Sequence, residues 1–152
     1  MSSRSSKADA SPAVHRWTVH LAAEFGHADI TQDLIWLVTE SAVQTGVLTV
    51  QMVGSTGAIT TIEYESGALN DLRRALDRLA PADADYAHNA RWGDGNGFAH
   101  VRSALLKTSF SIPVLEGKLA LGTWQQVVVI NLDNRARDRE LVAVLLGSQS
   151  SV

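Results

Sequence analysis

The sequence predicts an α+β domain in which antiparallel strands predominate. Segments with period-two alternation or with runs of β-branched residues recur along the chain, and turns containing glycine separate them. Fewer segments show helical spacing, and the clearest covers 66–79. With 152 residues, of which 45% are hydrophobic and 19% charged, the chain can bury one core. We therefore expect a single domain over 15–152, preceded by a flexible tail over 1–14 that is rich in serine and alanine.

The first part of the domain is predicted to contain three strands and one helix. Residues 16–23 alternate apolar and polar side chains, which favours a strand, and the apolar residues of 31–45 recur at helical spacing. Gly46 is the expected stop of that helix. Strands are also predicted over 47–53 and 58–65, because the first is rich in β-branched residues, the second alternates, and a segment with two glycines interrupts the pattern between them.

A second helix is predicted over 66–79, with Ser66 as its candidate N-cap and Pro81 as its end. Four leucines form its apolar stripe: Leu69, Leu72, Leu76 and Leu79. Charged residues lie off this stripe: Asp71, Arg73, Arg74, Asp77 and Arg78. An anion site is one interpretation of these charges, but a solvated helix face is the favoured one.

The last part of the domain is predicted to be mainly strands. After a loop over 81–97, a short helix over 97–107 is expected to turn three side chains inward: Phe98, Val101 and Leu105. Strands are then expected over 110–115, 118–121, 125–133 and 140–146, joined by a hairpin turn at Glu116-Gly117 and a connection over 134–138. The run 127–130 is apolar on both faces, which is typical of a central strand covered on both sides.

Composition argues against several classes of function. A net charge of -3 argues against a general nucleic-acid binder. The chain has no cysteine, which removes disulfides, thiolate nucleophiles and cysteine-based zinc sites, so histidine and carboxylate are the expected metal ligands. No segment approaches the roughly 20 apolar residues that span a membrane, and the start lacks the apolar core of a secretory signal. We expect a soluble, cytoplasmic protein without nucleic-acid or membrane partners.

Two histidines flank a polar turn near the middle of the chain. His88 and His100 lie on either side of WGDGNG, which contains Asp94 and Asn96. Imidazoles beside a carboxylate can hold a metal or transfer protons, because histidine titrates near neutral pH. Two imidazoles are fewer than the three or four protein ligands of a zinc site, so Asp94 or another segment would have to complete it. Simple turn chemistry, for which Asp-Gly and Asn-Gly are favoured, is the alternative for the loop.

His100 lies about 200° around its predicted helix from Phe98, at 100° per residue. Small residues and a lysine share its side: Ser103, Ala104 and Lys107. Another surface can approach such a face closely. We therefore expect His100 to point at a cleft or at a boundary between subunits, with an incidental surface histidine as the alternative.

Further candidates for ligand binding are polar or aromatic residues where strands begin or break: Ser55, Thr56, Trp124 and Gln125. Each has a structural alternative, since serine and threonine form turns and a tryptophan is commonly part of a core. Glu63 and Glu65 share one face of a predicted strand, and Asp71 follows in the next element. Paired carboxylates can perform acid–base chemistry or bind magnesium, although exposed alternating glutamates are commoner.

The order of four segments resembles the YjbQ-like family over about 17–147: VGSTGAITTIEYESGALNDL, YAHN, WGDGNGFAHVRSALL and SIPVLEGKLALGTWQQ. The resemblance implies a β-sandwich of mainly antiparallel strands with a few flanking helices, assembled as a homotrimer with sites between subunits. It places the family's histidines at His88 and His100 and its acidic positions at Glu63 and Asp71. A metal, zinc above all, is associated with the family's histidines. The family's HTT motif corresponds to 54–56 here, so its histidine is replaced by Gly54.

The resemblance also implies a reaction. Some members of the family have a secondary thiamine-phosphate synthase activity, which joins hydroxymethylpyrimidine pyrophosphate to thiazole phosphate. His88 or His100 would act as acid or base, and magnesium or a basic residue such as Arg91 or Arg102 would neutralise the pyrophosphate. Two alternatives stay open: a homotrimer that binds a metal or a small anionic ligand without turnover, and a family member that kept the fold and lost the chemistry.

Overall fold

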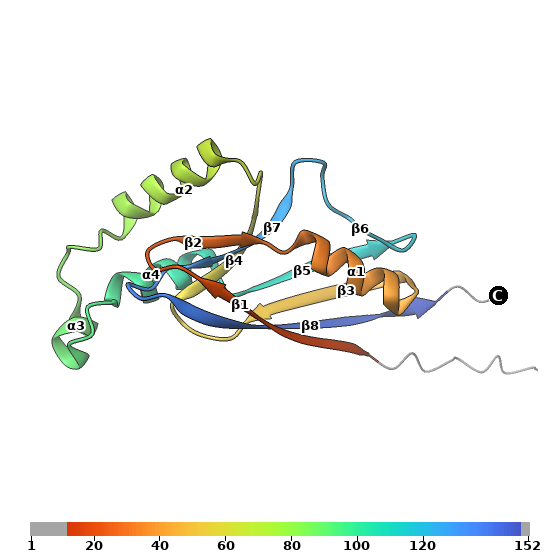
Figure 1. Ribbon diagram of the computed structural model, residues 1–152, viewed down its shortest axis with the longest axis horizontal. Coiled ribbons are helices and arrows are strands. Elements are labelled where there is room, and N and C mark those ends of the chain that lie inside the picture. The colour runs from red at the N-terminus through yellow and green to blue at the C-terminus, as the bar shows by residue number, and fades with distance from the viewer. Residues whose placement is uncertain (1–11, 150–152) are drawn as a thin grey trace, which may run out of the picture.

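Two antiparallel sheets form the molecule, and the computed structural model describes residues 12–149 (Figure 1). The strands of the larger sheet, in spatial order, are β1 (Ala13–Leu21), β8 (Arg137–Gln149), β3 (Val43–Met52), β5 (Ser109–Leu115) and β6 (Lys118–Leu119). The strands of the smaller sheet are β2 (Gly26–Asp29), β7 (Gln126–Asn131) and β4 (Gly57–Ile62). The predicted α+β class with mainly antiparallel strands is confirmed.

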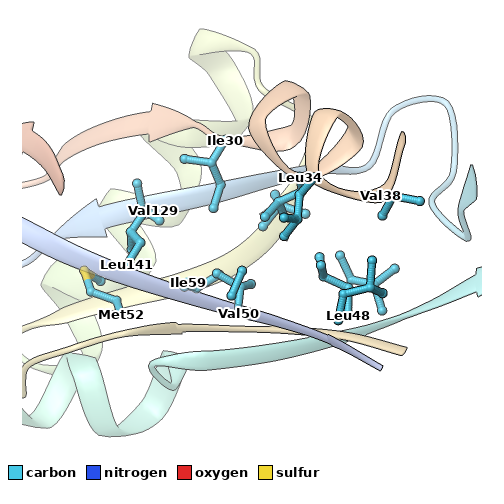
Figure 2. Packing of buried hydrophobic residues seen from close by; sticks show 14 of the residues in the cluster. Ile30, Leu34, Val38, Leu48, Val50, Met52, Ile59, Val129 and Leu141 are labelled. Carbon is cyan, nitrogen blue, oxygen red and sulfur yellow. The ribbon is translucent and has the colours of Figure 1, made fainter. Parts of the chain in front are cut away.

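The main core lies between the two sheets (Figure 2). Leu48 and Val50 of β3 and Leu141 of β8 meet Ile59 of β4 and Val129 of β7 there, and all five are at most 1% exposed. Packing of two sheets face to face over such a core is the sandwich arrangement. The sandwich expected from the resemblance is therefore present.

The central strand β7 is covered on both faces, as its apolar run predicts. Val127 and Val129 belong to the core between the sheets. Val128 and Ile130 belong to a second core on the other side of the small sheet, and all four are 0% exposed. A strand buried on both faces needs apolar residues in succession, because successive side chains point to opposite faces.

In the described part of the chain, four helices flank the sheets: α1 (Thr31–Ser41), α2 (Ser66–Leu79), α3 (Ala87–Trp92) and α4 (Gly97–Leu106). Helix α1 covers the main core with Leu34, Leu37 and Val38. Helices α2 and α4 contribute Leu69, Leu76, Phe98 and Ala99 to the second core. Helix α3 corrects the prediction of an uninterrupted loop over 81–97.

The predicted end of the first helix at Gly46 is wrong. Helix α1 ends at Ser41, and Ala42 takes the left-handed conformation that terminates it. Gly46 instead lies inside β3 opposite Gly147 of β8. A Cβ atom at position 46 would lie 2.2 Å from the carbonyl oxygen of Leu146, so glycine is needed there for close approach of two strands.

Three predictions about helix ends and faces are also corrected. Glu65, not Ser66, is the N-cap of α2, and its carboxylate accepts hydrogen bonds from the N–H groups of Gly67 (2.5 Å) and Ala68 (2.9 Å). Leu79, predicted to be part of the apolar stripe of α2, is 70% exposed.

The inward face of α4 is also different from the predicted one. Of the three side chains expected inside, only Phe98 is buried, whereas Val101 and Leu105 are 41% and 56% exposed. Arg102 is buried in their place. Its guanidinium donates to the carbonyl oxygen of Ala80 and forms a 2.9 Å ion pair with Asp77 of α2, which compensates for its burial.

Two other predictions concern the flexible tail and segments that span a membrane. The predicted tail over 1–14 lies mostly outside the described residues, but Ala13 and Val14 already belong to β1. Within 12–149, no helix is long and apolar enough to cross a membrane.

Candidate functional site

His88 and His100 come together at the end of the sandwich where α3 and α4 lie (Figure 1). Their ring centroids are 4.3 Å apart and their planes are inclined by 52°. The WGDGNG turn makes this approach possible, because Gly93 and Gly95 both adopt left-handed φ angles, 69° and 67°, that favour glycine. The two histidines predicted to form one site are therefore in contact.

A carboxylate and an amide surround the His88 ring. Nε2 of His88 lies 3.3 Å from Oδ2 of Asp94. Asn96 is buried, and in the amide orientation that satisfies its neighbours its nitrogen lies 3.2 Å from the same Nε2 and 3.1 Å from Oδ1 of Asp94. Protonated Nε2 can thus donate to Asp94, and unprotonated Nε2 can accept from Asn96. Both protonation states of His88 have a hydrogen-bond partner, as a proton-transferring group requires.

The turn that carries Asp94 is held in place from two sides. The side-chain amide of Asn134, from the β7–β8 connection, donates to the carbonyl oxygen of Asp94 at 3.0 Å. The N–H of Gly97 donates to the side-chain oxygen of Asn89 at 2.8 Å. These bonds fix the turn relative to α3 and to the sheet, so the geometry around His88 does not depend on an unsupported loop.

His100 lines a surface hollow of about 330 Å³. We call it the His100 hollow, and its lining residues are Gly54, Ser55, His100, Ser103, Ala104, Lys107 and Thr108. The residues predicted to share the side of His100 are thus found beside it. The β3–β4 connection, which contains Ser55, forms the facing wall. Lys107 is exposed and is the cation of this hollow, a role that sequence reasoning did not assign to it.

A buried polar network lies next to the hollow. The Thr56 hydroxyl donates to Oδ2 of Asp133 at 3.0 Å, and Nη2 of Arg139 donates to Thr56 Oγ1 at 2.9 Å and to Asn131 Oδ1 at 2.5 Å. Thr56 is therefore engaged within the protein. Burial raises the pKa of Asp133, but hydrogen bonds from Thr56 and Arg137 and the charge of Arg137 outweigh it and hold this pKa below its ordinary value.

Sequence reasoning missed Asp133 and Arg139. The available signal was weak: an aspartate at the end of an apolar run and an arginine just before a predicted strand. Neither pattern shows that the two side chains are 1% and 6% exposed. Only the pairing of β7 with β4 and of β8 with β3 brings these charges beneath the β3–β4 connection.

Other predicted site residues lie away from the histidines. Glu63 is exposed beyond the end of β4, and Asp71 pairs with Arg74 on the surface of α2. Trp124 is 71% exposed. Gln125 donates to Thr61 and lines a separate hollow of about 600 Å³ between α1 and the segment that joins β6 to β7. Within 12–149, no hydrogen bond or ion pair connects these residues to His88 or His100.

The residues of one chain do not fit the ligand set of a zinc ion. The described part of the chain contains no group of three or more histidine, aspartate or glutamate residues placed to hold a metal. Oδ2 of Asp94 already faces His88, and Gly54 has no side chain to donate. A zinc site at His88 and His100, as expected from the resemblance, would need a ligand from another chain or from the substrate.

Comparison with known proteins agrees with this fold. The family model described as UPF0047 protein YjbQ-like matches residues 15–148. A UPF0047 protein of Methanothermobacter thermautotrophicus is 38% identical over 116 residues, which cover 76% of this chain and 80% of that protein. A UPF0047 protein of Synechocystis is 36% identical over 113 residues, which cover 73% of this chain and 76% of that protein.

Solved structures agree as well. A crystal structure of a protein of unknown function from Sulfolobus solfataricus has a TM-score of 0.81 at 27% identity and covers 91% of this chain and 100% of its own. A hypothetical protein from Aeropyrum pernix has a TM-score of 0.82 at 26% identity and covers 90% of this chain and 99% of its own. Sequence and fold match over nearly the whole domain, and the chain therefore belongs to the YjbQ-like UPF0047 family.

Proposed function

We propose that this chain has thiamine-phosphate synthase activity at the His100 hollow, in a homotrimer whose sites lie between subunits. In this reaction the thiazole nitrogen attacks the methylene carbon of hydroxymethylpyrimidine pyrophosphate. A carbon–nitrogen bond forms, the carbon–oxygen bond breaks, and pyrophosphate leaves with the bonding electrons. The observation that carries the proposal is the contact between His100 and a His88 ring that has both Asp94 and Asn96 as partners.

The histidines can assist the departure of pyrophosphate. A protonated imidazole donates a hydrogen bond or a proton to the leaving oxygen, which lowers the negative charge that develops there. Oδ2 of Asp94 lies 3.3 Å from Nε2 of His88 and can accept a hydrogen bond from it, which orients the ring. His100 contacts the His88 ring and also lines the hollow, so a ligand in the hollow can reach the His100 side chain.

The cation in the hollow differs from the one predicted. Arg102 is engaged by Asp77 and the carbonyl of Ala80, so its guanidinium is not available to a ligand. Arg91 lies over the ring of Trp92, 5.4 Å from its centroid. Lys107 lines the hollow and takes the role of neutralising the pyrophosphate in the proposal.

The activity is tested by mixing the purified chain with the two substrates, with and without magnesium and zinc, and measuring thiamine phosphate by mass spectrometry. We expect product from the wild type and a loss of about 100-fold or more in His88→Gln and His100→Gln. His20→Gln is the matched control, because His20 also pairs with an aspartate, Asp138 at 2.6 Å, on an exposed part of the sheet. Absence of product from the wild type, or an equal loss in the control, contradicts the proposal.

A second candidate is a homotrimer that binds a small anionic ligand or a metal without turnover. Lys107 in the hollow favours its anion-binding form. Two observations count against its metal-binding form: Gly54 contributes no imidazole, and the described residues contain no metal-binding group of three donors. This candidate predicts saturable ligand binding with no product formed. Elemental analysis that finds less than one metal ion per three chains would eliminate its metal-binding form.

A further inference from the structure

Arg139 of β8 is a buried cation with hydrogen-bonding capacity that the protein does not use. The residue as a whole is only 6% exposed to solvent. All its hydrogen bonds come from Nη2, which donates to the carbonyl and hydroxyl oxygens of Thr56 and to Asn131. Within 12–149, its Nε has no partner and is shielded from solvent. Three of the five donor hydrogens of this guanidinium therefore have no acceptor among the residues that the structure describes.

No carboxylate of the described residues forms an ion pair with Arg139. The nearby Asp133 accepts hydrogen bonds from Thr56 at 3.0 Å and from Arg137, whose Nη2 lies 2.9 Å from it. Among residues 12–149, Arg139 has no acidic partner within ion-pair distance. Burial lowers the pKa of Arg139, Asp133 opposes this effect, and Arg137 adds to it. A buried charge without an ion partner is costly, so an anion beside Arg139 would be favoured.

The second terminal nitrogen of Arg139 lies beside Gly54, which has no side chain to cover it. A Cβ atom built on Gly54 would lie 3.1 Å from Nη1 of Arg139. Apart from the chain neighbours of Gly54, no other heavy atom of the described residues lies within 4 Å of that position. Gly54 has a φ of 140°, which side chains rarely adopt, so the connection keeps this position open. Gly54 also lines the His100 hollow together with Ser55 and Lys107.

We propose that the Gly54-Ser55 turn binds a phosphate or diphosphate group, with Nη1 of Arg139 on its inner side and Lys107 on its outer side. Two cations close to a turn without a bulky side chain match the charge and size of such a group. The assignment of this group to the pyrophosphate of the substrate rests on the proposed function. The binding of the anion does not require turnover.

A purely structural role for Arg139 makes a different prediction. In that case the guanidinium only connects β8 to Thr56 and Asn131, and an added anion would bind no better to the wild type than to a variant without this charge. Stability and anion affinity must therefore be measured separately.

The experiment is calorimetric titration of inorganic pyrophosphate into the full-length chain. We expect Arg139→Gln to weaken binding at least about tenfold and Arg139→Lys to lie between that variant and the wild type. Arg135→Gln is the matched control, since Arg135 is an exposed arginine of the adjacent connection, and we expect its affinity to stay within about twofold of the wild type. Equal losses in Arg139→Gln and Arg135→Gln, or no binding by the wild type, overturn the site.

A second variant keeps the test valid if circular dichroism shows that Arg139→Gln does not fold. Gly54→Ala retains the charge and places a methyl group beside Nη1, so it should also weaken pyrophosphate binding. Unchanged affinity in this variant overturns the site. Pyrophosphate binding without formation of thiamine phosphate supports the site and contradicts the proposed reaction. If a folded Arg139→Gln variant still forms thiamine phosphate and binds pyrophosphate as tightly as the wild type, the proposed reaction is supported and the anion site is contradicted.

Discussion

Glu65 illustrates how the three-dimensional position of a residue decides between a chemical and a structural role. In the sequence it forms a possible acid–base pair with Glu63 on one strand face. In the structure the strand ends at Ile62, and the carboxylate of Glu65 caps α2 by accepting two backbone N–H groups. The negative charge is also favourable at the N-terminus of a helix. Glu65 thus stabilises the helix that carries Leu69 and Leu76.

The pH dependence of stability should reveal this cap. Hydrogen bonds from Gly67 and Ala68 lower the pKa of Glu65, so the folded state favours the ionised form. A lowered pKa gives stability that is present above the ordinary pKa of glutamate and is lost as the pH falls through the folded-state value. We expect Glu65→Gln to have a lower melting temperature than the wild type at about pH 7, with the difference shrinking as the pH falls below the ordinary pKa of glutamate towards about 3. Thermal unfolding followed by circular dichroism measures this.

Glu63→Gln is the control for this prediction, because Glu63 is also exposed and caps no helix. Its melting temperature should follow that of the wild type at both pH values. A difference that persists at low pH in Glu65→Gln would show that its effect does not come from ionisation of the cap.

The candidate site was predictable only in part at this scale. His88, Asp94, Asn96 and His100 are close in sequence, so a short turn is enough to bring them together. Arg139 is far from His100 along the chain, and its role depends on strand pairing. A sequence pattern contains no information about which long-range neighbours neutralise a charge.

At the scale of elements, the helices show where hydrophobic periodicity succeeds and where it fails. The bounds of α2 agree with the predicted helix over 66–79, and its stripe correctly includes Leu69 and Leu76. The predicted face of α4 is wrong because the buried Arg102 side chain donates hydrogen bonds to Asp77 and to the carbonyl oxygen of Ala80. Periodicity assigns faces by polarity, and it fails where a buried polar group is satisfied by a partner on another helix.

The two ends of the leucine stripe in α2 should respond differently to truncation. Leu76 is 2% exposed and packs in the second core, whereas Leu79 is 70% exposed. We expect Leu76→Ala to lower the free energy of unfolding by about 2–5 kcal/mol, and Leu79→Ala to change it by less than about 0.5 kcal/mol. Urea denaturation of both variants measures the two values. Similar losses would mean that Leu79 is covered by another chain in solution.

At the scale of the whole molecule, the large sheet exposes apolar side chains on the face away from the core. Val47 of β3 is 40% exposed and lies opposite Leu146 of β8, which is 52% exposed. Leu115 of the neighbouring strand β5 is 55% exposed. Contiguous apolar residues on a sheet face mark an interaction surface. This face is where we expect the subunits of the proposed homotrimer to meet.

Size-exclusion chromatography with light scattering tests that assembly. We expect a mass of three chains for the wild type and a lower mass for Val47→Lys, because a charge in a subunit interface is costly to desolvate. Leu79→Lys is the control, since it places the same charge on an exposed leucine of α2. A single-chain mass for the wild type contradicts the trimer, and an unchanged mass for Val47→Lys removes this face from the interface.

The sequence by itself determined the fold class, most strands and helices, the central position of 127–130 and the meeting of His88 with His100. These features depend on local periodicity, turn chemistry and short separations along the chain. The tertiary structure decided which face of α4 is buried, that Glu65 caps a helix, and that Lys107 and Arg139 both lie near Gly54. Those outcomes depend on contacts between distant segments, where pairing of strands and compensation of buried charge outweigh local preference.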